Sequence, residues 1–512
     1  MKKLILFFCL QFCFISVAFA QNNQETISFQ ALQDDAELLW NALNELHPAL
    51  YKYNDTMALE EKYQKLLTDF SEDKTAEETL LLFSEFTAAI KCGHTGINPF
   101  NQENKIIDTL YNQKKLLPFT FKIIENQWVV YKSVSDKLKK GDVIVSINGN
   151  SSDIIFQNIT KYIKTDGDRQ IKKLKDVELT LTSKYEYFDY YFPLLYKLEN
   201  EIKVEVKKNG KETTETMTIE LLKKEERKDE FEKYFPLLTQ NYDDLWSFKL
   251  NTKYAYLELG TFQTEKLSYD WKRYLNDAFY QINKQKIPHL IIDVRGNEGG
   301  NKEVTQFLMG KIANKDWKPV FKKSYVAYNE VNDSLQIHLT TSNKKNYKSS
   351  SWTKRWNENY RVLKGTPDEP KIILSKLTAY KGKIYLLIDG KVSADAFELV
   401  ENCKKNNFAT LIGTTTGGTK KGFTAERFFV LNLPNSNIQI DIPLVGKYPI
   451  YKLEDEGIEP NVEEKETLGD FIARKDKALD KAKKIIEQTE KGKKEVEETE
   501  SEENEESEEN QK

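Results

Sequence analysis

Residues 384–412 read IYLLIDGKVSADAFELVENCKKNNFATLI, and their pattern indicates the fold of the region around them. An apolar run at 384–388 is followed by a turn, a helical pattern over 394–405 and a second apolar run at 409–412. Two short strands separated by one helix form a βαβ unit, in which the strands are parallel and the crossover is right-handed. Because both runs are continuously apolar, we expect a sheet that is covered on both faces.

The same pattern extends over the region that begins at residue 251. Apolar runs at 254–259 and 290–294 predict further strands, and 267–285 and 303–312 have helical character. The sequence therefore predicts an α/β region that ends near residue 469.

Two loops at the ends of predicted strands in this region contain residues that could carry chemistry. Ser393 opens the helix after strand 384–388, where a serine is either an N-cap or a nucleophile beside backbone N–H groups. Residues 293–300 read DVRGNEGG, and glycines at a helix start expose N–H groups that can bind an anion. Neither the Walker nor the G-x-G-x-x-G fingerprint is present, so a nucleotide site is not predicted. Ligands of α/β sheets bind at the carboxyl ends of strands, so we expect the two loops to form one site.

The preceding part of the chain is predicted to be helical up to about residue 92. Asp55 can cap one helix, and Thr75 with Glu78 has the spacing of a capping box before another. Gly93 supplies the expected helix stop. We assign an N-terminal helical segment to residues 21–110.

From residue 117 the pattern becomes alternating, which predicts a β-rich domain over 111–225. Leu138, Gly141-Asp142, an apolar strand and Asn148-Gly149 follow one another in the order typical of a PDZ-like domain, which the segment resembles. An ordinary hairpin with an Asn-Gly turn is the alternative. PDZ-type modules bind an extended peptide at a sheet edge, and we expect the residues that lead into the first strand to bind it: Leu117, Pro118 and Phe119.

The two ends of the chain differ from its body in charge. The chain has 512 residues, 76 basic and 80 acidic side chains and a net charge of −4. Residues 1–20 have two lysines, an apolar stretch and an Ala-Phe-Ala ending, which predicts a signal peptide cleaved after Ala20; an uncleaved anchor helix is the alternative. Residues 491–512 contribute −6, so the remaining body is neutral, which argues against a nucleic-acid binder. We expect an exposed helix over 470–490, a disordered acidic tail and no membrane span after cleavage.

The cysteines and histidines outside the leader are few. Cys92 and Cys403 form no disulfide framework, and we expect two buried small hydrophobes. The four histidines are scattered without the spacing of metal ligands, so no metal site is predicted.

Several motifs occur together in an order that resembles S41 serine peptidases, the group of carboxyl-terminal processing and tricorn-core-like proteases. They are Gly-His-Thr at 93–95, the PDZ-like region, DVRGNEGG at 293–300, VSADAFE at 392–398, GTTTGG at 413–418 and EDEGIEPN at 454–461. The resemblance spans roughly residues 35–465 and implies a multidomain α/β (α+β) fold with a ClpP/crotonase-like protease core over 226–469. Asp395 and Asn461 depart from the family pattern.

The resemblance implies roles for individual residues. Ser393 is expected to be the nucleophile and His94 its general base, with Glu454 as a late carboxylate; Glu456 is the alternative if the register slips by two. Some members use a lysine instead, but Lys420 and Lys421 are shifted by a residue or more from that position. The expected oxyanion-hole donors are the backbone N–H groups of Gly299 or Gly300 and of Ala394.

The sequence therefore predicts a serine peptidase, exported to the periplasm of a bacterial cell envelope or secreted. It would hydrolyse extended or unfolded polypeptides, as tail-specific proteases do, without a cofactor. The alternative is a catalytically silent protein of the same fold that binds peptides.

Overall fold

The computed structural model describes residues 25–235 and 241–492. The predicted signal peptide and almost all of the predicted acidic tail lie outside these ranges. No helix in the described ranges is both long and apolar enough to cross a membrane.

The N-terminal helices form as their capping residues predict. They are α1 (Phe29–Leu46), α2 (Thr56–Asp69) and α3 (Ala76–Ala89). Asp55 accepts a hydrogen bond from the Ala58 N–H at the start of α2, and Thr75 with Glu78 forms the capping box of α3. The residue with left-handed backbone after α3 is Lys91, at φ 60°, rather than the expected Gly93. The chain therefore turns two residues earlier than the glycine indicated.

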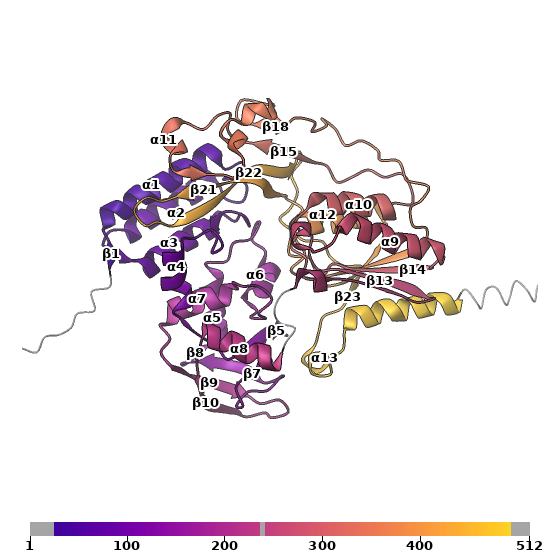
Figure 1. Ribbon diagram of the computed structural model, residues 1–512, viewed down its shortest axis with the longest axis horizontal. Helices are drawn as coiled ribbons and strands as arrows, with labels where there is room; N and C mark the ends of the chain where they lie inside the picture. The colour runs from indigo at the N-terminus through magenta and orange to yellow at the C-terminus, as the bar shows by residue number, and fades with distance from the viewer. Residues whose placement is uncertain (1–24, 236–240, 493–512) are drawn as a thin grey trace, which may run out of the picture.

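A β-rich domain follows, drawn in magenta in Figure 1. Its antiparallel sheet has the order β10-β9-β7-β6-β5, with β8 paired to β7. The strands are β5 (Phe119–Ile124), β6 (Gln127–Ser133), β7 (Val143–Ile147), β8 (Asn150–Ser151), β9 (Glu201–Lys207) and β10 (Thr214–Glu220). The helices are α5 (Ser152–Thr160), α6 (Gln170–Val177), α7 (Tyr187–Tyr196) and α8 (Lys224–Tyr234).

The α/β region contains the predicted βαβ unit. Strands β19 (Lys383–Ile388) and β20 (Thr410–Gly413) pair in parallel, with Tyr385 opposite Thr410, and α12 (Ala394–Asn406) connects them. The whole sheet has the order β12-β13-β14-β19-β20-β23 and is parallel apart from β12. Its other elements are β12 (Trp246–Leu250), β13 (Tyr254–Leu259), β14 (His289–Asp293), β23 (Val462–Glu463), α9 (Trp271–Lys284) and α10 (Lys302–Ile312).

A second sheet joins the α/β region to the N-terminal helices. Its order is β16-β21-β22-β15-β18-β17, and β3 (Gly96–Ile97) pairs with β22, with Ile97 opposite Ile440. One hydrophobic core continues through this sheet, the N-terminal helices and the β-rich domain. The strands are β15 (Lys322–Val326), β16 (Leu339–Thr340), β17 (Thr353–Arg355), β18 (Arg361–Leu363), β21 (Phe423–Asn432) and β22 (Gln439–Pro449).

The C-terminal segment is not the fully exposed helix that its charge indicated. A helix over residues 477–492 lies along the face of the parallel sheet opposite α9, α10 and α12 (Figure 1). It buries Ala478, Ala482 and Ile486 against the sheet, and its Asp476 end forms a two-point ion pair with Arg295, at 2.7 and 2.8 Å. The prediction of exposure is wrong because a narrow small-residue stripe suffices to bury one face of an otherwise charged helix.

Candidate active site

A cavity of about 1560 Å³ lies at the carboxyl ends of β14 and β19, and we call it the central cavity. Its walls come from the α/β sheet, the β-rich domain and the C-terminal segment. Ser393, His94 and Ala394 all line it. The structure therefore brings the predicted nucleophile, base and one oxyanion donor to one site, although they are up to 300 residues apart in sequence.

Ser393 occupies the N-cap position, directly before the first residue of α12, but its side chain does not cap the helix. Its hydroxyl makes no capping hydrogen bond and instead donates to the backbone carbonyl of Lys391, at 3.1 Å. The following residue, Ala394, has left-handed backbone at φ 49°. A non-glycine residue with this backbone is strained, and such strain typically occurs at functional turns. This turn presents the serine hydroxyl to the cavity rather than to the helix.

The two predicted loops are held together around Asn297 and Asp389. The buried Asn297 side chain donates to the Leu259 carbonyl at 2.7 Å, and its backbone carbonyl accepts from the Ser393 N–H at 3.2 Å. Asp389 accepts from the N–H groups of both Gly296 and Lys391, at 3.0 Å each. These bonds fix the backbone of the serine turn against the DVRGNEGG loop.

Only part of the predicted oxyanion hole is available. The Gly299 N–H already donates to the Asn297 side chain at 2.8 Å, so it is not free to bind an oxyanion. Within the described residues the N–H groups of Gly300 and Ala394 have no hydrogen-bond partner, and of the two only Ala394 lines the central cavity. Both glycines are nevertheless required sterically. A Cβ on Gly299 would lie 2.7 Å from the Ala394 Cβ, and a Cβ on Gly300 would lie 2.4 Å from the Phe262 backbone.

His94 lies in the cavity wall as a neutral imidazole. Burial lowers its pKa to about 4, helped by the nearby ammonium groups of Lys164 and Lys172 and opposed by Glu298. Its Nδ1 is buried and has no hydrogen-bond partner in the described chain. No hydrogen bond joins His94 to Ser393 within those residues. A neutral imidazole can accept a proton, so His94 is in the correct state for a general base once the two side chains meet.

A charged network that the sequence reasoning missed lies beside His94. Lys172 forms ion pairs with Asp176, at 2.6 Å, and with Glu298. Burial alone would lower the pKa of Lys172, but these two carboxylates raise it above its usual value. Burial also acts to lower the pKa of Lys391, but Glu298 and Asp176 raise it above its usual value. Both lysines are therefore held protonated, and neither is suited to act as the base.

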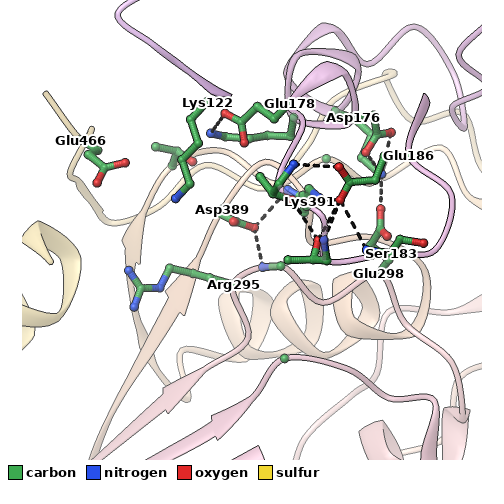
Figure 2. Close-up of a pocket in the computed structure, with 18 of the residues that line it drawn as sticks. Lys122, Asp176, Glu178, Ser183, Glu186, Arg295, Glu298, Asp389, Lys391 and Glu466 are labelled. Carbon is green, nitrogen blue, oxygen red and sulfur yellow. Dashed lines mark hydrogen bonds and ion pairs between the residues drawn. The ribbon is translucent and has the colours of Figure 1, made fainter. Parts of the chain in front are cut away.

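The gathering of these charges is visible in Figure 2, where Asp176, Glu186 and Glu298 lie on one side of the pocket. Glu298 belongs to the DVRGNEGG motif in the sequence, but its ion-pair partner Lys172 is 126 residues away along the chain. Only the fold brings them together.

The structure does not bring the predicted late carboxylates into the cavity. Glu454 is exposed and does not line it, and Glu456 is exposed and forms an ion pair with Lys420 at 3.1 Å. The side chain of Asp455, which lies between them in sequence, instead accepts a hydrogen bond from the Asp168 N–H at 2.8 Å. The carboxylate that lies in the cavity and acts on the charge of His94 is Glu298.

The predicted peptide-binding residues are not available to a peptide. Leu117 and Phe119 are 2% and 0% exposed, Pro118 is buried, and none of the three lines the central cavity. The prediction is wrong for these side chains because Phe119 begins the buried strand β5, and Leu117 and Phe119 belong to the hydrophobic core.

The two departures from the motif pattern have structural roles. Asp395 is buried and lies 3.5 Å from the Lys447 ammonium. Asn461 joins the 454–461 segment to β20: its side-chain oxygen accepts from the Leu411 N–H at 3.0 Å, and its own N–H donates to the Leu411 carbonyl at 2.8 Å.

Comparison with known proteins identifies a family for part of the chain and a shared fold. Residues 253–464 match the model of peptidase family S41. The structure of mature CPAF complexed with lactacystin is similar at a TM-score of 0.62 and 12% identity, covering 90% of this chain and 98% of that chain. Mature CPAF alone gives 0.60 and 12%, covering 90% and 96%. At this identity the likeness shows a shared fold. No curated protein sequence matches the chain.

Proposed function

Because the chain carries a peptidase family S41 domain, we propose that it is a serine peptidase in which Ser393 is the nucleophile and His94 the general base. The observation that carries the proposal is the convergence of Ser393, His94 and Ala394 on the central cavity, at the end of the central strand β19. A serine hydroxyl is a poor nucleophile at neutral pH and needs such a base.

The reaction proceeds through an acyl-enzyme. The Ser393 hydroxyl leaves the Lys391 carbonyl, gives its proton to His94 and attacks the carbonyl carbon of the scissile peptide bond. The Ala394 N–H donates to the oxyanion that forms. His94 then returns the proton to the leaving amine as the C–N bond breaks, and water, deprotonated by His94, hydrolyses the ester and restores Ser393.

The substrate is an extended or unfolded polypeptide. The central cavity is large and is walled by several segments, which suits a chain rather than a small molecule. We place the protein outside the cytoplasm, in the periplasm or beyond the cell, on the pattern of residues 1–20. Sequencing the N-terminus of the mature protein tests the location: cleavage predicts Gln21 as the first residue, whereas a retained Met1 contradicts it.

Hydrolysis of an unfolded polypeptide by the wild type, Ser393→Ala and His94→Gln tests the chemistry. The proposal predicts loss of activity by at least about 10³-fold in both variants, because neither attack nor proton transfer can proceed normally. Equal activity of wild type and Ser393→Ala overturns it.

The second candidate function, peptide binding without cleavage, is favoured by one observation: the Ser393 hydroxyl bonds to a carbonyl rather than to His94. The same experiment separates the two, since a silent binder retains the polypeptide and never cleaves it.

A further inference from the structure

On the wall of the central cavity formed by the β-rich domain and the C-terminal segment, we define a group of four cationic side chains as the basic cluster. Its members are Lys122, Lys132, Lys140 and Arg474, and all four line the cavity that contains Ser393. Figure 2 shows Lys122 extending into the pocket on the side where Arg295 and Glu466 lie, away from the Asp176–Glu298 network.

The three lysines of the basic cluster gather around a platform of two aromatic rings. The ring centroids of Tyr131 and Phe471 are 6.0 Å apart. The ammonium groups of Lys122 and Lys132 both lie 5.0 Å from the Tyr131 centroid, and that of Lys140 lies 4.4 Å from the Phe471 centroid. Cation–π contacts hold these side chains in place without neutralising their charge.

The C-terminal segment completes this platform. Phe471 belongs to α13 (Leu468–Ile472) and packs on Ile124, Val129 and Val143 of the β-rich sheet. Arg474 follows with left-handed backbone at φ 56°. The platform thus exists only where the C-terminal segment meets the β-rich domain.

The basic cluster has no bound counter-charge within the described chain. None of its four members forms an ion pair there, whereas Lys172 and Lys175 in the same cavity are paired with Asp176 and Glu178. Burial and the neighbouring Lys122 lower the pKa of Lys132. Burial, Arg474 and Lys122 lower the pKa of Lys140. Glu466 opposes the shift of Lys140 but makes no ion pair with it.

We propose that the basic cluster binds the carboxylate side chains of an acidic segment of the polypeptide substrate, at a distance from the bond that is cut. The inference rests on the proposed peptidase function and adds a substrate class to it. Several like charges held close together repel one another, and a ligand carrying several carboxylates relieves that repulsion. Because the cluster and Ser393 line one cavity, a single extended chain can occupy both.

Matched peptides test this inference. Two carry the same fluorogenic cleavage segment and an amidated C-terminus, one followed by four glutamates and the other by four glutamines; a third carries the glutamines and a free terminal carboxylate. The wild type is expected to cleave the glutamate peptide with at least a 10-fold higher kcat/KM at low salt, and the preference should shrink at 0.5 M salt.

Two triple variants identify the residues responsible. Lys122→Gln, Lys132→Gln and Lys140→Gln together should abolish the preference and leave cleavage of the glutamine peptide within about 3-fold. The control makes the same lysine-to-glutamine change at three exposed lysines of the same domain, Lys197, Lys203 and Lys211. It changes the net charge equally and should keep the preference for the glutamate peptide.

Binding to Ser393→Ala, followed by fluorescence anisotropy, separates this inference from the proposed function. Tighter binding of the glutamate peptide that depends on the basic cluster supports the inference even if no peptide is cleaved. Equal binding of the glutamate and glutamine peptides, or a preference only for the free terminal carboxylate, overturns it and leaves the peptidase function standing.

Discussion

Gly299 and Ala394 approach so closely that a Cβ on the glycine would lie 2.7 Å from the Ala394 Cβ. The DVRGNEGG loop and the turn that presents Ser393 therefore fit together only because residue 299 lacks a side chain. This contact fixes the position of the Ala394 N–H, which is the expected oxyanion donor.

Gly299→Ala should disable the enzyme. Both a left-handed backbone, at φ 88°, and the clash with Ala394 oppose the new side chain. We expect kcat/KM to fall by about 100-fold, because a displacement of about 1 Å in a catalytic group has such an effect. Gly296→Ala is the matched control: φ is 78°, but nothing lies within 4 Å of the added Cβ. It should lose only about 1–2 kcal/mol of stability and stay active. Equal activity loss in both variants would show that the contact is unimportant.

Asn297→Ala should destabilise the site more than Asn301→Ala. Asn297 is fully buried, and its loss leaves the Leu259 carbonyl and the Gly299 N–H without their partner. Each unsatisfied buried group costs about 1–3 kcal/mol. Asn301 instead caps α10, and removing a cap costs about 1 kcal/mol. Urea denaturation of both variants measures the difference, and equal losses contradict the assignment.

Lys172→Met should move the acidic limb of the pH–kcat/KM profile to higher pH. The positive charge of Lys172 contributes to the lowered pKa of His94, so its removal raises that pKa. His94 then becomes protonated, and inactive as a base, at a higher pH than in the wild type. Lys175→Met is the control, since it removes the same charge from the same cavity but from a lysine paired with Glu178. An unchanged limb in Lys172→Met contradicts a base role for His94 next to this network.

Asp166→Asn should stabilise the protein increasingly as the pH rises from about 4 to about 8. Burial, together with Cys92, raises the pKa of Asp166 to about 8, so the folded state keeps the proton that the unfolded chain releases near pH 4. A raised folded-state pKa contributes stability that is lost as pH rises towards that value, and asparagine cannot lose a proton. The Tm difference between variant and wild type should therefore grow across this window. Asp168→Asn, at an exposed position two residues away, is the control; a Tm difference for Asp166→Asn that does not change with pH would contradict the burial argument.

Much of the fold follows from local signals. The βαβ unit at 383–413 and the capping box of α3 could be predicted because apolar runs, caps and turns are encoded by neighbouring residues. The C-terminal helix could have been found too: Ala478, Ala482 and Ile486 recur every four residues, which is a buried stripe, but the surrounding lysines and glutamates concealed it.

Only those residues of the candidate site that belong to recognisable motifs could be predicted. Ser393 and His94 occur in recognisable contexts, and the structure places both in the central cavity. The network beside them was not predictable, because the Lys172–Glu298 ion pair depends on how the β-rich domain packs against the α/β region. Glu454 shows the converse error: a residue in the matching motif position points to solvent, while Glu298 lies in the cavity.

The most direct test of the account is labelling with a fluorophosphonate, which reacts with an activated serine hydroxyl, followed by peptide mapping. We expect one adduct, on Ser393, which disappears in Ser393→Ala and forms far more slowly in His94→Gln. An adduct on another serine, or undiminished labelling of His94→Gln, would contradict it.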